Sequence, residues 1–89
     1  MIIKAFKIEP EAAIKIFEKH NVRQEEIYDV LKNNKPKFKK AGGNQYVAIG
    51  SSRSRYITIF FNYDEKTKEA EITTAYPSGK SQIKFYKKK

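Results

Sequence analysis

The chain has 89 residues, enough for one domain with a single core and too few for a second, so we expect residues 1–89 to form one domain. Cysteine is absent, which excludes disulfides, thiolate catalysis and sulfur-ligated zinc, and favours a reducing cytoplasm. No stretch approaches the roughly 18 apolar residues of a membrane span, and residues 1–4 are too short for a signal peptide. We therefore expect a soluble protein that begins at its own methionine and does not engage a membrane.

The net charge of +9 comes from 19 basic and 10 acidic side chains that are unevenly distributed. Residues 1–34 carry six basic and six acidic side chains, and residues 64–89 carry seven and four. Residues 35–63, in contrast, carry six basic and no acidic side chains. This pattern predicts one electropositive face, which suits a nucleic acid or an acidic protein partner. A lysine-rich composition from an AT-rich genome is the alternative interpretation.

The first third of the chain predicts a short strand and two helices. An apolar run over residues 2–8 ends at Pro10, which suits the first position of a helix that continues from residue 12 to His20. A second helix is expected to begin at residues 23–26 and to end near residue 33, with Ile27, Val30 and Leu31 on one face.

After Pro36 the pattern becomes that of β-strands, at residues 37–39, 46–49, 56–61 and 69–76, with a hairpin turn at residues 64–68. The tail at residues 81–86 has room for one helical turn or one short edge strand, and residues 87–89 are expected to be disordered. This order predicts an α+β fold, in which two N-terminal helices pack on one face of an antiparallel β-sheet.

His20 is the only histidine, at the C-terminal end of the first predicted helix. The helix dipole favours a protonated imidazole there, which suits a phosphate ligand or a general acid. A half-buried histidine that fills the corner between two helices is the alternative. One histidine without cysteine argues against a transition-metal site.

Arg53 and Arg55 lie in a polar turn between two apolar strands. Only three of the 19 basic residues are arginine, and a guanidinium can bind phosphate in a bidentate manner. We therefore predict phosphate contacts here, with an ordinary polar hairpin loop as the alternative.

Tyr76, Ser78 and Lys80 follow one another at the end of the last predicted strand and the turn after it. The tyrosine suits base stacking or donation to a phosphate, and the lysine suits stabilisation of charge on the phosphorus centre. The alternative is a strand-terminating turn with an exposed aromatic residue.

Basic and aromatic residues alternate around Lys37, Lys39 and Lys40, as expected where a strand follows a phosphate backbone. A charged edge strand protected from aggregation is an equal alternative. We group Lys84, in the tail, with these predicted RNA-binding residues.

The sequence lacks a Walker loop, GxGxxG, HExxH and any Cys/His metal spacing, so we expect no metal and no cofactor. A nuclease on this chain would therefore work without metal. RNA suits such a mechanism because it carries its own nucleophile, the 2′-hydroxyl, and needs only an acid, a base and cationic stabilisation.

Short motifs along most of the chain resemble the BrnT toxin family. They include residues 6–10, the Lys19-His20-x-Val22 corner, the acidic pair Glu25-Glu26, a basic turn ending at Arg55 and the Thr74-Ala75 pair. The chain departs from the family at Tyr76, where an arginine is usual, and at Gln82-Ile83, where a Glu-Arg pair is usual.

The resemblance implies a RelE-like ribonuclease toxin that pairs with a dimeric, DNA-binding ribbon-helix-helix antitoxin. It implies catalytic roles for His20, Arg55, Tyr76 and Lys80, with Tyr76 and Lys80 replacing the missing family residues. The sequence thus predicts a metal-independent endoribonuclease that inhibits translation. A non-catalytic RNA-binding or phage-encoded interaction protein is the alternative.

Overall fold

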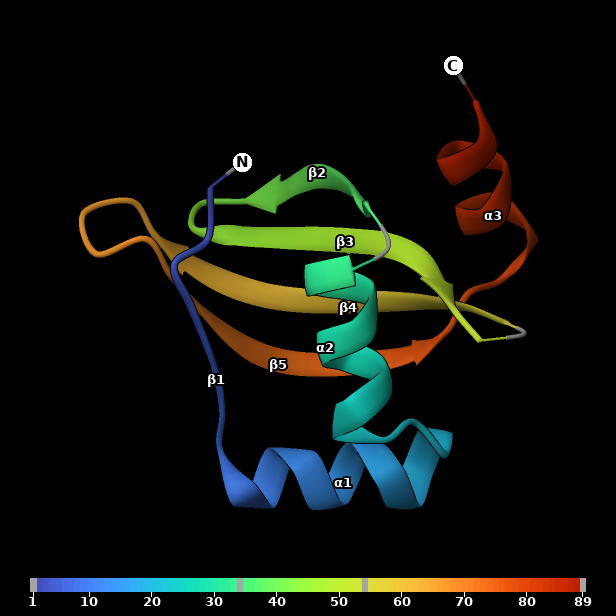
Figure 1. Ribbon diagram of the computed structural model, residues 1–89, viewed down its shortest axis with the longest axis horizontal. Helices are drawn as coiled ribbons and strands as arrows, with labels where there is room; N and C mark the ends of the chain where they lie inside the picture. The colour runs from blue at the N-terminus through green and yellow to red at the C-terminus, as the bar shows by residue number, and fades with distance from the viewer. Residues whose placement is uncertain (1, 34, 54, 89) are drawn as a thin grey trace.

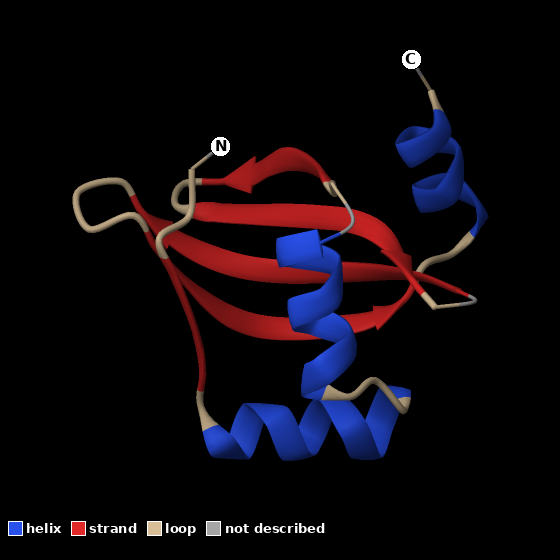
Figure 2. Cartoon of the chain, in the orientation of Figure 1, coloured by secondary structure: helices blue, strands red, loops and turns tan. Residues whose placement is uncertain are grey.

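The computed structural model describes residues 2–33, 35–53 and 55–88. Within them the chain forms a five-stranded sheet with three helices arranged around it (Figures 1 and 2). In chain order the elements are β1 (Ala5–Ile8), α1 (Pro10–His20), α2 (Gln24–Asn33), β2 (Lys37–Gly42), β3 (Gln45–Ser52), β4 (Arg55–Asp64), β5 (Glu69–Pro77) and α3 (Lys80–Lys87). The α+β class expected from the sequence is confirmed.

The strand order in the sheet is β1-β5-β4-β3-β2. Strands β2 to β5 form the antiparallel meander expected from the sequence. The first strand differs, because β1 pairs with β5 in parallel, so the sheet is mixed rather than antiparallel. A parallel neighbour is possible because α1, α2 and three strands separate β1 from β5 along the chain.

The first helix begins where the sequence predicts, since Pro10 occupies its first turn. It ends at His20 and is capped by Asn21, which adopts the left-handed conformation (φ 55°). Helix α2 crosses the sheet over β3 and β4, and α1 lies along the β5 side (Figure 1). Both helices and the loop between them contribute buried side chains to one core, among them Ile16 of α1, Val22 of the loop and Val30 of α2, which belong to one cluster with Ile59 and Phe61 of β4. We call this side of the sheet the α2 face.

The tail forms a helix of eight residues, longer than the single turn expected, and not an edge strand. The α3 backbone accepts hydrogen bonds from Lys37, at Phe85 O (3.2 Å) and at Lys88 O. Phe38 of β2 faces the core on the α2 face. Its neighbours Lys37 and Lys39 therefore project from the opposite side of the sheet, which we call the α3 face. Lys87 is the last residue of α3 and Lys88 caps the helix, whereas Lys89 lies outside the described residues; the expected disorder of residues 87–89 stays a prediction.

Gly50 of β3 lies under α2 and allows this helix to approach the sheet closely. A Cβ at this position would come within 2.9 Å of Val30 Cγ1 and 3.3 Å of the Pro36 backbone. The α2 face therefore has no room for a side chain here, for a steric reason and not a conformational one.

We predict that Gly50→Ala lowers the free energy of unfolding by about 1–3 kcal/mol, the usual cost of overpacking. In a Val30→Ala background the same substitution should cost less, because the atom at 2.9 Å is gone. Urea denaturation of the four proteins measures this coupling. Equal costs in both backgrounds would contradict the close packing of α2 on β3.

Candidate active site

Strands β4 and β5 bring a group of polar and aromatic side chains together on the α3 face. The hairpin register pairs Thr58 with Tyr76 and Phe60 with Thr74, with a bulge at Thr73. The Tyr76 ring lies 6.0 Å from the Phe60 ring, centroid to centroid, at an interplanar angle of 32°. The two aromatic side chains form a platform at the end of β5.

His20 reaches this platform from α1. Strand β1 pairs with β5 only as far as Ile72, so the last part of β5 is left to the C-terminal end of α1. The imidazole centroid lies 5.8 Å from the Tyr76 ring centroid, at an interplanar angle of 53°. The structure thus brings together two of the four residues predicted to be catalytic.

Ser78 and Lys80 follow Tyr76 at the same end of the sheet. The Ser78 hydroxyl lies 2.7 Å from the hydroxyl of the buried Thr58, and the Ser78 amide donates to Tyr56 O at 2.9 Å. Lys80 is exposed at the first position of α3. The helix start is fixed by Gln82, whose side-chain oxygen accepts a hydrogen bond from the Gly79 amide at 2.6 Å.

A pocket of about 430 Å³ opens beside His20, between α1 and β5. Lys15 and Lys19 of α1 and Thr73 and Thr74 of β5 line it, together with the carboxylates of Glu9 and Glu11. Cationic, hydroxyl and acidic groups therefore lie next to His20, and none of them was predicted from the sequence.

Arg55 lies at the same end of the sheet but on the opposite face. Its partner in the ladder is Ser52, and alternation along β4 puts it on the side of Ile57, away from Thr58 and Tyr76. Its guanidinium donates to both carboxylate oxygens of Glu26, at 2.8 Å and 2.6 Å. The structure therefore does not bring Arg55 together with the His20–Tyr76 pair.

The Glu26–Arg55 pair is largely shielded from water, with side-chain exposures of 10% and 33% respectively. The hydrogen bond from Arg55 holds the pKa of Glu26 below its ordinary value, and it outweighs the opposing effect of burial. The same bond raises the pKa of Arg55. Both groups are therefore charged at neutral pH, and the pair is a fixed part of the fold.

Arg53 has a different environment from Arg55. It is exposed in the β3–β4 turn and lies 3.7 Å from Glu25, with 71% and 75% of the two side chains accessible. An ion pair so exposed contributes little to stability, which leaves this guanidinium able to contact another molecule.

The predicted RNA-binding lysines fall into two groups. Lys37 and Lys39 both contact α3, with their ammonium groups 5.4 Å and 5.5 Å from the Phe85 ring centroid. Lys40 and Lys84 are exposed. Lys37 and Lys39 thus lie on the α3 face and also hold the C-terminal helix, whereas Lys40, whose ladder partner is Tyr46, projects from the α2 face.

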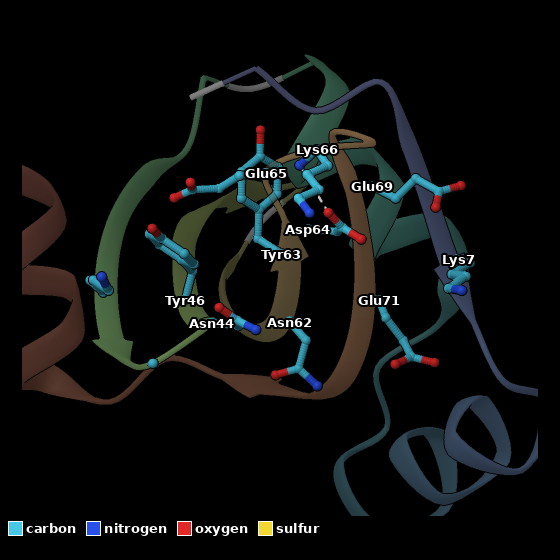
Figure 3. A pocket seen from close by; sticks show the side chains of 12 residues that line it. Lys7, Asn44, Tyr46, Asn62, Tyr63, Asp64, Glu65, Lys66, Glu69 and Glu71 are labelled. Atoms are coloured by element: carbon cyan, nitrogen blue, oxygen red, sulfur yellow. Dashed lines mark hydrogen bonds between the residues drawn. The ribbon is translucent and has the colours of Figure 1, made fainter.

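A larger pocket, of about 620 Å³, lies at the far end of the sheet around the β4–β5 turn (Figure 3). Its lining has mixed charge, with four carboxylates from Asp64, Glu65, Glu69 and Glu71 and three ammonium groups from Lys7, Lys40 and Lys66. Among the described residues no three His, Cys, Asp or Glu side chains are grouped to hold a metal ion.

Sequence reasoning missed Phe60 and Thr58 as neighbours of Tyr76, and Glu26 as the partner of Arg55. Alternation along the strand residues 56–61 already carried the first signal, because it puts positions 58 and 60 on one face. No local signal points to the Glu26–Arg55 pair, since 29 residues separate its members.

The fold of this sheet and its helices is similar to that of a known ribonuclease toxin. The crystal structure of the Brucella abortus ribonuclease toxin BrnT superposes with a TM-score of 0.69 at 11% sequence identity, covering 85% of this chain and 97% of that one. The fold expected from the BrnT resemblance is therefore confirmed. No family model and no curated protein sequence matches the chain, and none of the helices in the described ranges is long and apolar enough to cross a membrane.

We predict that Glu26→Gln loses about 1–3 kcal/mol of stability at pH 7, the scale of hydrogen bonds to charged groups. Because the folded-state pKa is lowered, the carboxylate stabilises the fold above its unfolded pKa, near 4.5, and this contribution is lost as the pH falls through the folded value. The difference between variant and wild type should therefore shrink below about pH 4.

Glu25→Gln is the matched control, because its ion pair is exposed, and it should change stability by less than about 1 kcal/mol at every pH. Urea unfolding between pH 3 and pH 7 measures both variants. Equal losses at positions 25 and 26 would contradict the structural role of the Glu26–Arg55 pair.

Proposed function

We propose that this protein is a metal-independent endoribonuclease toxin of a toxin-antitoxin module, which inhibits translation by cutting RNA. The observation that carries the proposal is the His20–Tyr76 pair, with ring centroids 5.8 Å apart, at the sheet end of a fold shared with a ribonuclease toxin. A histidine beside a phenol supplies the proton donor and acceptor that the reaction requires.

In the proposed reaction the RNA 2′-hydroxyl attacks the adjacent phosphorus, and the 5′-oxygen of the next nucleotide leaves. His20 takes the proton from the 2′-hydroxyl or gives one to the leaving oxygen, and solvent water makes the other of these two proton transfers. Tyr76 donates a hydrogen bond to the scissile phosphate, and Lys80 stabilises the charge that develops there. The products carry a 2′,3′-cyclic phosphate and a 5′-hydroxyl.

The aromatic platform favours single-stranded RNA. An unpaired base can stack on Tyr76 and Phe60, whereas a base inside a duplex cannot reach them. Phosphates on either side would contact Lys37, Lys39 and Lys84 on the α3 face and Lys40 on the edge strand β2, with Ser78 and Arg53 at the sheet end.

A toxin of this kind requires a cognate antitoxin, and we propose a dimeric ribbon-helix-helix protein as the partner in the cytoplasm. The charge of the chain supports an acidic antitoxin segment, since the acid-free residues 35–63 carry six of the basic side chains.

A non-catalytic RNA-binding or phage-encoded interaction protein is the second candidate. It is favoured by Tyr76 and Gln82, which stand where the resemblance leads us to expect charged residues. Gln82 serves as a cap for α3 instead. A binder would distribute its affinity over many lysines, whereas an enzyme depends on one or two residues.

We predict that expression of the chain without an antitoxin arrests growth, because a ribonuclease toxin depletes translatable RNA. His20→Ala should remove the arrest at equal soluble expression. Growth curves with total-RNA gels measure both effects. Normal growth and intact RNA with the wild-type protein would overturn the toxin proposal.

We predict that Tyr76→Phe slows RNA cleavage by roughly 10²-fold, the scale for loss of one donor to a developing oxyanion. Tyr46→Phe is the matched control, because Tyr46 packs on the α2 face against Phe61 and its loss of a hydroxyl should not affect the rate. Single-turnover cleavage in EDTA measures both rates. Equal rates for the two variants, or no cleavage in EDTA, would contradict the assigned site.

RNA affinity should fall with salt, since each phosphate contact adds about 0.7 to the slope of log affinity against log salt for single strands. Replacing Lys37, Lys39 and Lys40 together by Gln should flatten this slope by about two contacts or more. The control replaces Lys4, Lys32 and Lys66, which the proposed RNA path does not include. Equal slopes for the two triple variants would place the RNA on another surface.

A further inference from the structure

Arg55 connects three elements that are distant in sequence. Its Nε and Nη2 atoms donate to the Glu26 carboxylate in the first turn of α2, and Nη2 also donates to Asn21 O at 2.7 Å. Arg55 itself begins β4. One side chain therefore ties the end of α1 and the start of α2 to the sheet.

The carbonyl that Arg55 contacts belongs to the residue directly after His20. Asn21 ends α1 in the left-handed conformation, and its amide donates to Phe17 O at 2.8 Å. A shift of the Asn21 carbonyl would therefore move the last turn of α1, which carries His20 toward β5. The hydrogen bond from Arg55 to Asn21 O therefore fixes the position of the last turn of α1, and with it the position of the His20 imidazole.

The Glu26 carboxylate is itself held in place. Its Oε1 atom accepts a hydrogen bond from the Arg23 amide at 3.2 Å, at the start of α2. Since the carboxylate also accepts two bonds from Arg55, the corner between α1 and α2 is closed by one connected set of hydrogen bonds. Only a planar guanidinium with several donors can bind the carboxylate and the Asn21 carbonyl together.

We propose that Arg55 is a positioning residue, which holds His20 against Tyr76 through the Asn21 carbonyl, with Glu26 fixing the guanidinium. This inference rests on the proposed function for its catalytic consequence, but the placement of the imidazole is measurable without any RNA. It assigns Arg55 a role on the α2 face, in place of the direct phosphate contact that the sequence suggests.

The test compares Arg55→Lys with Arg23→Lys. Lysine at position 55 keeps the charge beside Glu26 but lacks the fork that reaches Asn21 as well. Arg23 lies at the same corner, with its guanidinium 5.8 Å from the Phe17 ring centroid, and makes no side-chain bond that links α1 to β4 in the described residues. The two variants are compared only if each shows a cooperative urea-unfolding transition, because such a transition shows that the variant is folded.

In the Arg55→Lys protein we expect a weakened NOE between the His20 and Tyr76 rings, and His20 ring-proton shifts that move toward those of a free imidazole. We also expect kcat to fall by about 10²-fold at little-changed KM, the scale of a 1 Å misplacement. The Arg23→Lys protein should keep the NOE, the shifts and the rate.

An unchanged NOE and unchanged His20 shifts in a folded Arg55→Lys protein would overturn the inference. If Arg55→Lys does not fold, Glu26→Gln gives the same comparison, because it weakens the hold on the guanidinium while preserving the shape of the side chain. If the wild-type protein cuts no RNA, the proposed function fails, yet the NOE still decides whether Arg55 positions His20.

Discussion

Three elements of this small fold meet at the guanidinium of Arg55. It is bound to the Glu26 carboxylate and to the carbonyl that ends α1, so it sets how the two N-terminal helices meet the sheet. On the opposite face of the same strand, Thr58 and Phe60 form the floor beside Tyr76. One strand thus separates the group that holds the fold at this corner from the groups proposed to act on RNA.

The place of the site also depends on a short strand. Because β1 has only four residues, its pairing with β5 ends at Ile72, and the end of α1 occupies the remaining length of β5. A longer β1 would hold the helix away from Tyr76. The same short strand makes the sheet mixed, since it enters in parallel after a crossover that includes both helices.

Much of this arrangement follows from local sequence signals. Pro10 predicts the start of α1, and the polar turn at residues 64–68 predicts the direct pairing of β4 with β5, which the observed register confirms. The parallel pairing of β1 and the Glu26–Arg55 bond were not predictable, because both join distant segments and no local pattern encodes them. The length of α3 was not predictable either, because α3 is stabilised by a hydrogen bond from Lys37, which lies 48 positions before Phe85 in the sequence.

We propose that RNA supplies its own nucleophile at the His20–Tyr76 pair. The most direct measurement uses one RNA that the protein cuts at a mapped position and the same RNA with a single 2′-deoxy nucleotide on the 5′ side of that position. We expect the parent RNA to yield a 2′,3′-cyclic phosphate and a 5′-hydroxyl, and the deoxy substrate not to be cut there. Cleavage of the deoxy substrate at the same position, or products with a 5′-phosphate, would contradict this proposal.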